Sequence, residues 1–154
     1  MGEPMTFDDD ALDRAVRNLT ARYCDAVARF DMELFASLWA DDADWVVGSG
    51  APTSGRDRIA RVFGRLRGDY GLCTQELMSG YVTPDAATTS ASARWQIREY
   101  QWKADAPVNC VMGIYSDQLA VREGRCLFVR RRFDVLYRGP VDLTGAITPP
   151  DVID

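Results

Sequence analysis

The chain has 154 residues, which is the length of one domain with a substantial hydrophobic core. Apolar residues make up 47% and charged residues 27% of it, and the net charge of −5 disfavours nucleic-acid binding. There is no histidine, which excludes Ser-His-Asp and Cys-His catalytic devices and histidine metal ligands. With no signal-peptide pattern and no apolar run that could span a membrane, we expect a cytoplasmic protein that does not bind membranes.

The cysteines and the lysine offer no cofactor chemistry. Four cysteines (Cys24, Cys73, Cys110 and Cys126) are widely spaced and form no CxxC pair, so we expect reduced, mostly buried thiols. A zinc site is not expected without histidine. Lys103 is the single lysine and lies in a polar stretch, where nothing would activate it as a Schiff base. We therefore expect no metal and no other cofactor.

The first part of the chain is predicted to be helical. Residues 1–8 are expected to be a flexible tail. A helix is predicted over 9–29, because apolar residues recur at three- and four-residue spacing from Leu12 to Phe30. Asp31 is predicted to cap a second helix over 32–40, and a third helix is predicted over 57–67.

The second part is predicted to be extended. Residues 41–47 lead into a flexible loop, and four longer runs follow at 73–83, 87–103, 108–122 and 126–138, separated by turn signals. Helices followed by consecutive strands predict an α+β domain over 9–140: a cone-shaped barrel in which three helices pack in the concave face of a strongly bent antiparallel sheet. Residues 141–154 are expected to be a second tail.

A cavity is expected between the helices and the sheet, and strand alternation predicts which side chains face it. Arg131 stands out in the last strand as a charge in an otherwise apolar row. The two rows of that strand are Val129, Arg131, Phe133, Val135 and Tyr137 on one face, and Phe128, Arg130, Arg132, Asp134 and Arg138 on the other.

Glu76 is a second unusual charge. In strict alternation it shares a face with Thr74, Met78 and Val82. A carboxylate that is partly desolvated there would have a raised pKa and could act as a general base or acid. The alternative is a structural ion pair between Glu76 and an arginine of a facing strand.

The order of several motifs resembles the SnoaL-like branch of the nuclear transport factor 2-like superfamily. The motifs are a long helix ending in ARFD, then LWADDADW, GRDRI, and a late hairpin, GIYSDQLAVREGRCLFVRRRF, and together they cover about residues 10–138. The resemblance implies the same cone-shaped α+β fold. It does not fix an activity, because the superfamily contains dehydratases, a dehydrochlorinase, cyclases, isomerases, epoxide hydrolases and non-catalytic binders.

The resemblance also implies positions for a site. The aspartate and histidine of the dehydratase-like branch fall on Ala28 and Glu76, so both members of that dyad are replaced. The late-hairpin arginine falls on Arg131. The positions that line the pocket fall on Trp45, Val111, Gly113 and Tyr115.

These observations favour a cofactor-independent lyase or isomerase that acts on a small, mostly apolar, aromatic or polycyclic metabolite. Glu76 would move a proton, Tyr23 or Tyr115 would hydrogen-bond the oxygen where charge develops, and Arg131 would stabilise an anion. Trp45, Met78 and Phe133 would form an apolar wall. Tyr23 could equally be an ordinary core residue.

Two other functions stay open. One is a binding or dimerisation module without turnover, and the other is an epoxide-hydrolase-like enzyme, which needs two buried aspartates around an arginine. Aspartates Asp117 and Asp134 lie on predicted strands, but Asp134 belongs to the polar row. Aromatic residues on the outer face of the sheet suggest a homodimer or homotrimer.

Overall fold

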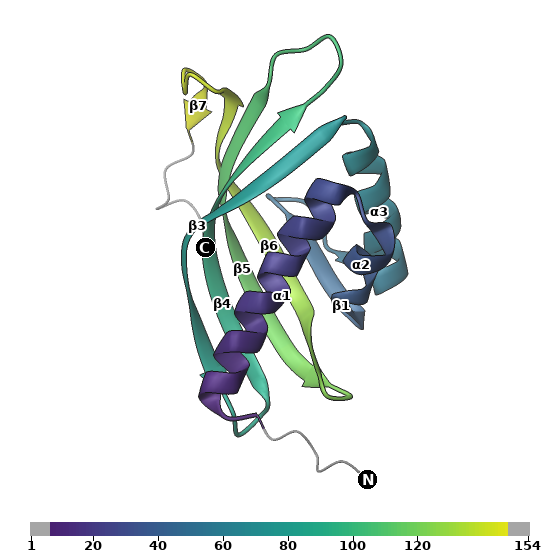
Figure 1. Ribbon diagram of the computed structural model, residues 1–154, viewed down its shortest axis with the longest axis vertical. Helices are drawn as coiled ribbons and strands as arrows, with labels where there is room; N and C mark the ends of the chain where they lie inside the picture. Colours follow the sequence, from purple (N-terminus) through teal and green to yellow (C-terminus); the bar gives the residue numbers. More distant parts are fainter. Residues whose placement is uncertain (1–6, 148–154) are drawn as a thin grey trace.

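The computed structural model describes residues 7–147 as three helices and one curved sheet (Figure 1). The helices are α1 (Asp9–Arg29), α2 (Met32–Ser37) and α3 (Arg56–Gly68). The strands are β1 (Trp39–Val47), β2 (Thr53–Ser54), β3 (Leu72–Asp85), β4 (Ser90–Trp102), β5 (Asn109–Arg122), β6 (Arg125–Pro140) and β7 (Ala146–Ile147). The predicted α+β class is confirmed. No helix in the described range is long and apolar enough to cross a membrane.

Helix α1 has the predicted limits, and its ends explain them. The Asp8 carboxylate accepts a hydrogen bond from the Ala11 amide at 2.7 Å, and Phe30 ends the helix in the left-handed conformation with a φ of 53°. Leu12, Val16 and Tyr23 are buried on one side of the helix, as the spacing predicts. This stripe packs α1 across the concave face of the sheet (Figure 1).

Helix α2 is shorter than predicted. Asp31 caps it as expected, since its carboxylate accepts from the Leu34 amide at 2.9 Å. The helix ends at Ser37, and Trp39 begins β1, where it pairs with Phe128 of β6 and is fully buried. Burial of Trp39 against the sheet therefore overrides a continued helical pattern.

Within residues 7–147 the seven strands form one sheet in the order β2-β1-β6-β5-β4-β3, with β7 added beside β6. The sheet is strongly curved but does not close, and β2 and β3 are its edges. Strands β3, β4, β5 and β6 pair antiparallel in sequence order as predicted, whereas β1 pairs with β6 in parallel.

The predicted tails are only partly described. The C-terminal tail was expected from 141, but Ala146 and Ile147 form β7 and pair with Arg138 and Tyr137 of β6. At the other end, Asp8 belongs to the capped start of α1. The rest of both predicted tails, residues 1–6 and 148–154, lies outside the described residues.

Three β-bulges interrupt the regular alternation of the long strands. One extra residue is inserted at Met78 in β3, at Val129 in β6 and at Leu136 in β6, as the shifts in strand pairing show. A one-residue insertion reverses which face the following side chains point to. Val82 and Arg138 therefore face the concave side of the sheet, contrary to strict alternation.

Candidate functional site

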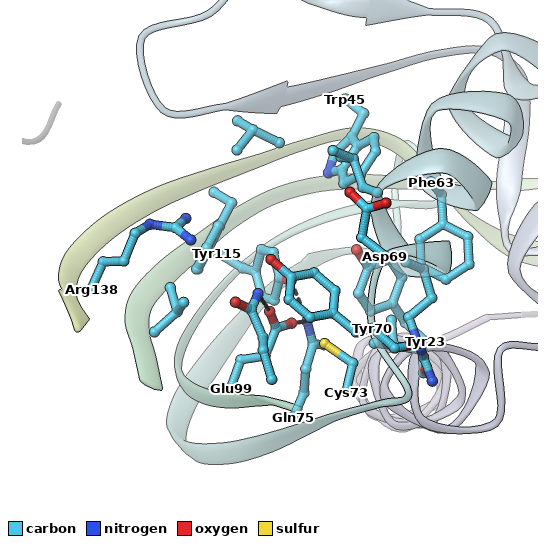
Figure 2. Close-up of a pocket in the computed structure, with 17 residues that line it drawn as sticks. Tyr23, Trp45, Phe63, Asp69, Tyr70, Cys73, Gln75, Glu99, Tyr115 and Arg138 are labelled. Atoms are coloured by element: carbon cyan, nitrogen blue, oxygen red, sulfur yellow. Dashed lines mark hydrogen bonds between the residues drawn. The ribbon is translucent and has the colours of Figure 1, made fainter. Parts of the chain in front are cut away.

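A cavity of about 240 Å³ opens between α1, α3 and the concave face of the sheet (Figure 2). Its apolar walls come from helix α3 and from strands β1, β5 and β6, and include Trp45, Val47, Phe63, Leu66, Val111 and Phe133. Its polar groups come mainly from the sheet and include Cys73, Gln75, Glu99, Gln101, Tyr115 and Arg138. A cavity that is largely apolar with a few convergent polar groups is typical of a small-molecule site.

Strand register places four of these residues in one row across the sheet. Gln75 of β3 pairs with Glu99 of β4, Glu99 pairs with Val111 of β5, and Val111 pairs with Arg138 of β6. Directly paired residues of adjacent strands point to the same face. All four therefore face the cavity, and one valine separates the carboxylate of Glu99 from the guanidinium of Arg138.

Glu99 is the carboxylate at the centre of the hydrogen-bond network. Its Oε2 accepts from Gln75 Nε2 at 2.6 Å, and its Oε1 accepts from Gln101 Nε2. Gln101 is itself held by Asn109, whose Nδ2 donates to Gln101 Oε1 at 2.8 Å. Since an ionised carboxylate has about four acceptor positions, Glu99 can still accept a further proton in this fixed orientation.

The Cys73 thiol borders the same carboxylate. Burial, and after it the neighbouring Glu99 carboxylate, raises the pKa of Cys73 above its ordinary value. A thiol with a raised pKa stays protonated at neutral pH and is a poor nucleophile. The raised pKa of Cys73 therefore indicates a residue that donates a proton or packs against its neighbours, and not a covalent nucleophile.

Two phenols lie at the inner end of the cavity. Gln75 Nε2 donates to the Tyr115 hydroxyl at 2.9 Å, and because an amide nitrogen only donates, the Tyr115 oxygen is the acceptor. Tyr115 can consequently donate its hydroxyl proton, and the neighbouring Tyr23 oxygen is one acceptor for it. Burial raises the pKa of Tyr23 to about 12 and that of Tyr115 well above its ordinary value, although Arg131 opposes both shifts. Both phenols stay protonated at neutral pH and can donate.

Two polar atoms of the lining lack a partner. Trp45 Nε1 and Gln75 Oε1 are buried and make no hydrogen bond to any described residue. Buried polar groups are usually satisfied, because an unmade hydrogen bond costs about 1–3 kcal/mol. One donor and one acceptor of the lining residues are therefore left without a hydrogen bond.

Arg131 does not line the cavity, contrary to expectation. It is fully buried behind the phenols, where Nε and Nη2 each donate to Asp117 at 2.8 Å. Its guanidinium carbon lies 4.3 Å from the ring centroid of Tyr23 and 3.9 Å from that of Tyr115. The guanidinium is thus enclosed by a carboxylate and aromatic rings, out of reach of a substrate anion.

Glu76 lies on the outer face of the sheet, not in the cavity. Its side chain is 47% exposed, and Oε2 accepts from Arg98 Nη2 at 2.7 Å. The predicted row was wrong because the bulge at Met78 separates Glu76 from the inward-facing Val82. The alternative of an ion pair with an arginine of the facing strand is the arrangement observed.

Met78 and Gly113 are also placed differently from the prediction. Met78 is the bulge residue of β3, is 47% exposed and does not line the cavity. Gly113 lies behind a wall residue, since a Cβ atom there would approach Phe133 Cε2 to 2.3 Å. Gly113 makes room for the Phe133 ring and does not itself contact a ligand in the cavity.

The other five predicted residues line the cavity: Tyr23, Trp45, Val111, Tyr115 and Phe133. Sequence reasoning missed Glu99 and Arg138. A signal for Glu99 was present, because Trp95, Ile97, Glu99 and Gln101 alternate along one strand and the first two are strongly apolar. Arg138 could not be found by alternation, because the bulge at Leu136 reverses its direction.

No metal site is apparent in residues 7–147, where no three cysteine, aspartate or glutamate side chains group closely enough to hold an ion. The pair that an epoxide-hydrolase-like site would need is also separated. Asp117 is bound to Arg131 outside the cavity, and Asp134 is bound to Arg132 on the outer face.

Comparison with known families identifies the group to which this architecture belongs. The sequence profile of the SnoaL-like domain matches residues 11–132. The chain belongs to the SnoaL-like domain family. The resemblance noted in the sequence is thereby confirmed, and the matched region contains most of α1, Glu99 and Tyr115 but ends before Arg138. No curated protein matches this SnoaL-like chain.

Solved structures share the fold of this SnoaL-like domain at low sequence identity. A candidate scytalone dehydratase from Novosphingobium aromaticivorans DSM 12444 has a TM-score of 0.77 at 16% identity, over 87% of this chain and 90% of that one. The hexachlorocyclohexane dehydrochlorinase LinA-type3 from Novosphingobium barchaimii LL02 has a TM-score of 0.74 at 14% identity, over 88% and 94%. Kfla4162 from Kribbella flavida has a TM-score of 0.77 at 17% identity, over 88% and 98%.

Proposed function

We propose that this SnoaL-like domain is a cofactor-independent lyase or isomerase that acts on a small, mostly apolar, aromatic or polycyclic molecule. The observation that carries the proposal is Glu99, a carboxylate fixed on the inner face of the sheet beside the Tyr115 phenol, whose raised pKa keeps its hydroxyl protonated at neutral pH. The dehydratase and dehydrochlorinase names among the structural neighbours belong to lyases and support the same class.

Proton abstraction is the first step. Glu99 takes a proton from a carbon next to a carbonyl group, and the electron pair of the broken C–H bond moves toward the carbonyl oxygen. The hydroxyl of Tyr115 donates a hydrogen bond to that oxygen as negative charge develops on it. Gln75 supports both residues, because its amide group contacts the Glu99 carboxylate and the Tyr115 oxygen.

The second step decides between the two reaction types. In an isomerisation the proton returns from Glu99 to a different carbon. In an elimination the electron pair of the enolate forms a new C=C bond, the bond from the neighbouring carbon to its leaving group breaks, and that group departs with the electrons of the broken bond. The apolar walls formed by Trp45 and Phe133 keep water from the intermediate in either case.

Deuterium exchange tests the first step without knowledge of the natural substrate. The probe is 2-tetralone, an aromatic bicyclic ketone with an acidic C–H bond, incubated in D₂O and followed by NMR. We expect the wild type to accelerate exchange over buffer, and Glu99→Gln to lower this rate by about a hundredfold or more. Glu76→Gln is the matched control on the neighbouring strand and should exchange like the wild type. Undiminished exchange by Glu99→Gln, or buffer-level exchange by the wild type, would contradict the proposal.

A binding module without turnover is the second candidate, and the network around Glu99 favours it. Both carboxylate oxygens already accept amide protons from Gln75 and Gln101, an arrangement that also suits a purely structural carboxylate. This candidate predicts no exchange of 2-tetralone, together with a rise in melting temperature when an aromatic ligand is added. Small-molecule binding and self-association in a homodimer or homotrimer are compatible with both candidates.

A further inference from the structure

The two arginines that line the cavity differ in what they bind. Arg67 is buried, and each of its three guanidinium nitrogens donates to a backbone carbonyl. Its Nε donates to Val27 O at 2.7 Å, its Nη1 to Tyr70 O at 2.7 Å, and its Nη2 to Ala28 O at 3.2 Å. Arg67 therefore joins α3 to the end of α1, and its guanidinium is held in place by the backbone of the fold.

The side chain of Arg138, in contrast, makes no hydrogen bond or ion pair with any residue in the described range 7–147. It extends from β6 on the sheet side of the cavity, as Figure 2 shows. A guanidinium offers several donors in a planar fork that matches a carboxylate in a bidentate arrangement. Arg138 is the cavity cation that a ligand can reach.

The register fixes how far this cation lies from the proposed base. Glu99 and Arg138 occupy the same row on β4 and β6, with Val111 of β5 between them. Strands are spaced by about 4.8 Å, so the two backbone positions lie roughly 10 Å apart. The apolar side chain of Val111 covers the interval. A flat apolar body can lie over Val111, with its reactive end at Glu99 and an anionic end at Arg138.

Other charges at the cavity limit where an anion can bind. Glu99 and Asp69 are carboxylates of the lining, and both repel a second negative charge. Asp69 follows α3 and lies on the helix side in Figure 2, opposite the side from which Arg138 extends. The Arg138 end of the row is therefore the favourable position for an anionic group.

We propose that the substrate carries a carboxylate, or an equivalent anionic oxygen group, on an aromatic or polycyclic body, and that Arg138 binds this group while Glu99 acts at the other end. The inference rests on the proposed function only in taking this cavity as the substrate site. It assigns to Arg138 the anion-binding role that sequence reasoning had given to Arg131.

Matched acid and amide ligands test this assignment by isothermal titration calorimetry. The probes are 2-naphthoate and 2-naphthamide, which share the same body and differ in charge. We expect the wild type to bind the acid about fivefold more tightly than the amide, as suits an ion pair at a partly exposed site. In Arg138→Gln the two ligands should bind equally. Arg130→Gln removes an arginine from the outer face of the same strand and should keep the preference of the wild type.

Three results would overturn the inference: equal or weaker binding of the acid by the wild type, binding of neither ligand, or an unchanged preference in Arg138→Gln. The outcome is separable from that of the exchange experiment. If exchange depends on Glu99 but no acid preference is found, only the assignment of Arg138 fails. If the acid preference depends on Arg138 but Glu99→Gln exchanges like the wild type, the lyase mechanism fails and anion binding stands.

Discussion

The concave face of the sheet carries an acid and an arginine at each of two places, and the two pairs are arranged differently. Asp117 and Arg131 are direct register partners on β5 and β6, and both side chains are fully buried in a two-hydrogen-bond ion pair. Glu99 and Arg138 lie on β4 and β6, with Val111 between them. The two charges of the first pair neutralise each other, whereas the second pair leaves a gap between its charges that a ligand can fill.

This difference shows that pairing register, more than residue type, separates structural from functional charges in this fold. Opposite charges on adjacent strands reach each other and neutralise, and burial then makes them costly to disturb. Opposite charges that are separated by an intervening strand are too far apart to form an ion pair with each other. We therefore expect substitutions at the two places to affect different measurements.

The largest effect is expected when the closed pair is broken. Arg131→Met leaves the Asp117 carboxylate buried without its partner and should lower the free energy of unfolding by about 3–5 kcal/mol, measured by urea denaturation. The double substitution Arg131→Met with Asp117→Leu removes both charges and should recover most of that loss. A free energy of unfolding for Arg131→Met within about 1 kcal/mol of the wild type would show that the pair is not a structural element.

An intermediate effect is expected from the phenol enclosed beside this pair. An unfolded tyrosine ionises near pH 10.0, whereas burial raises the pKa of Tyr23 to about 12 in the folded protein. Between these values the folded state holds a proton that the unfolded state has lost, so stability falls as the pH rises. The fall is about 1.4 kcal/mol per pH unit for this group.

The free energy of unfolding, measured by urea denaturation, should therefore fall between pH 10 and 12 by about 2–3 kcal/mol less in Tyr23→Phe than in the wild type. Tyr81→Phe is the control, because Tyr81 is 60% exposed, and its curve should follow the wild type. Parallel curves for Tyr23→Phe and the wild type would contradict the expected ionisation of a buried phenol.

The smallest effect is expected on the outer face. Glu76→Gln removes an exposed ion pair with Arg98 and should change the free energy of unfolding by less than about 1 kcal/mol. The same variant should keep the deuterium exchange rate of the wild type, since Glu76 does not reach the cavity. A loss of exchange comparable to that of Glu99→Gln would return Glu76 to consideration as the base.

Much of the fold could be predicted because its signals are local. The apolar stripe predicted α1, and the turn signals predicted four long strands. The parallel pairing of β1 with β6 could not be predicted, because it depends on contacts between segments far apart in the sequence. The end of α2 was missed for the same reason, since burial of Trp39 against β6 decides it.

The site was predicted less well, and the reason is physical. Alternation assigns faces correctly between bulges, which is why the inward direction of Phe133 was found, whereas Tyr115 was found through the family resemblance. A β-bulge adds one residue to a strand without a sequence signal as clear as that of a turn. Arg138 was therefore assigned to the outer face, and Glu76 was placed in the same row as the inward-facing Val82. The position of Arg131 within an apolar row was identified, but its pairing with Asp117 needed the register.

The bulge at Leu136 has a consequence for how such a site could change during evolution. If Leu136 joined the regular pairing opposite Met112, the strand beyond Val135 would shift by one residue, and the side chain of Arg138 would turn to the outside of the sheet. Tyr137 would then stand opposite Val111 and face the cavity in place of Arg138, with no substitution at all. A one-residue shift in the pairing of β6 is thus a short route to a new ligand preference on an unchanged scaffold.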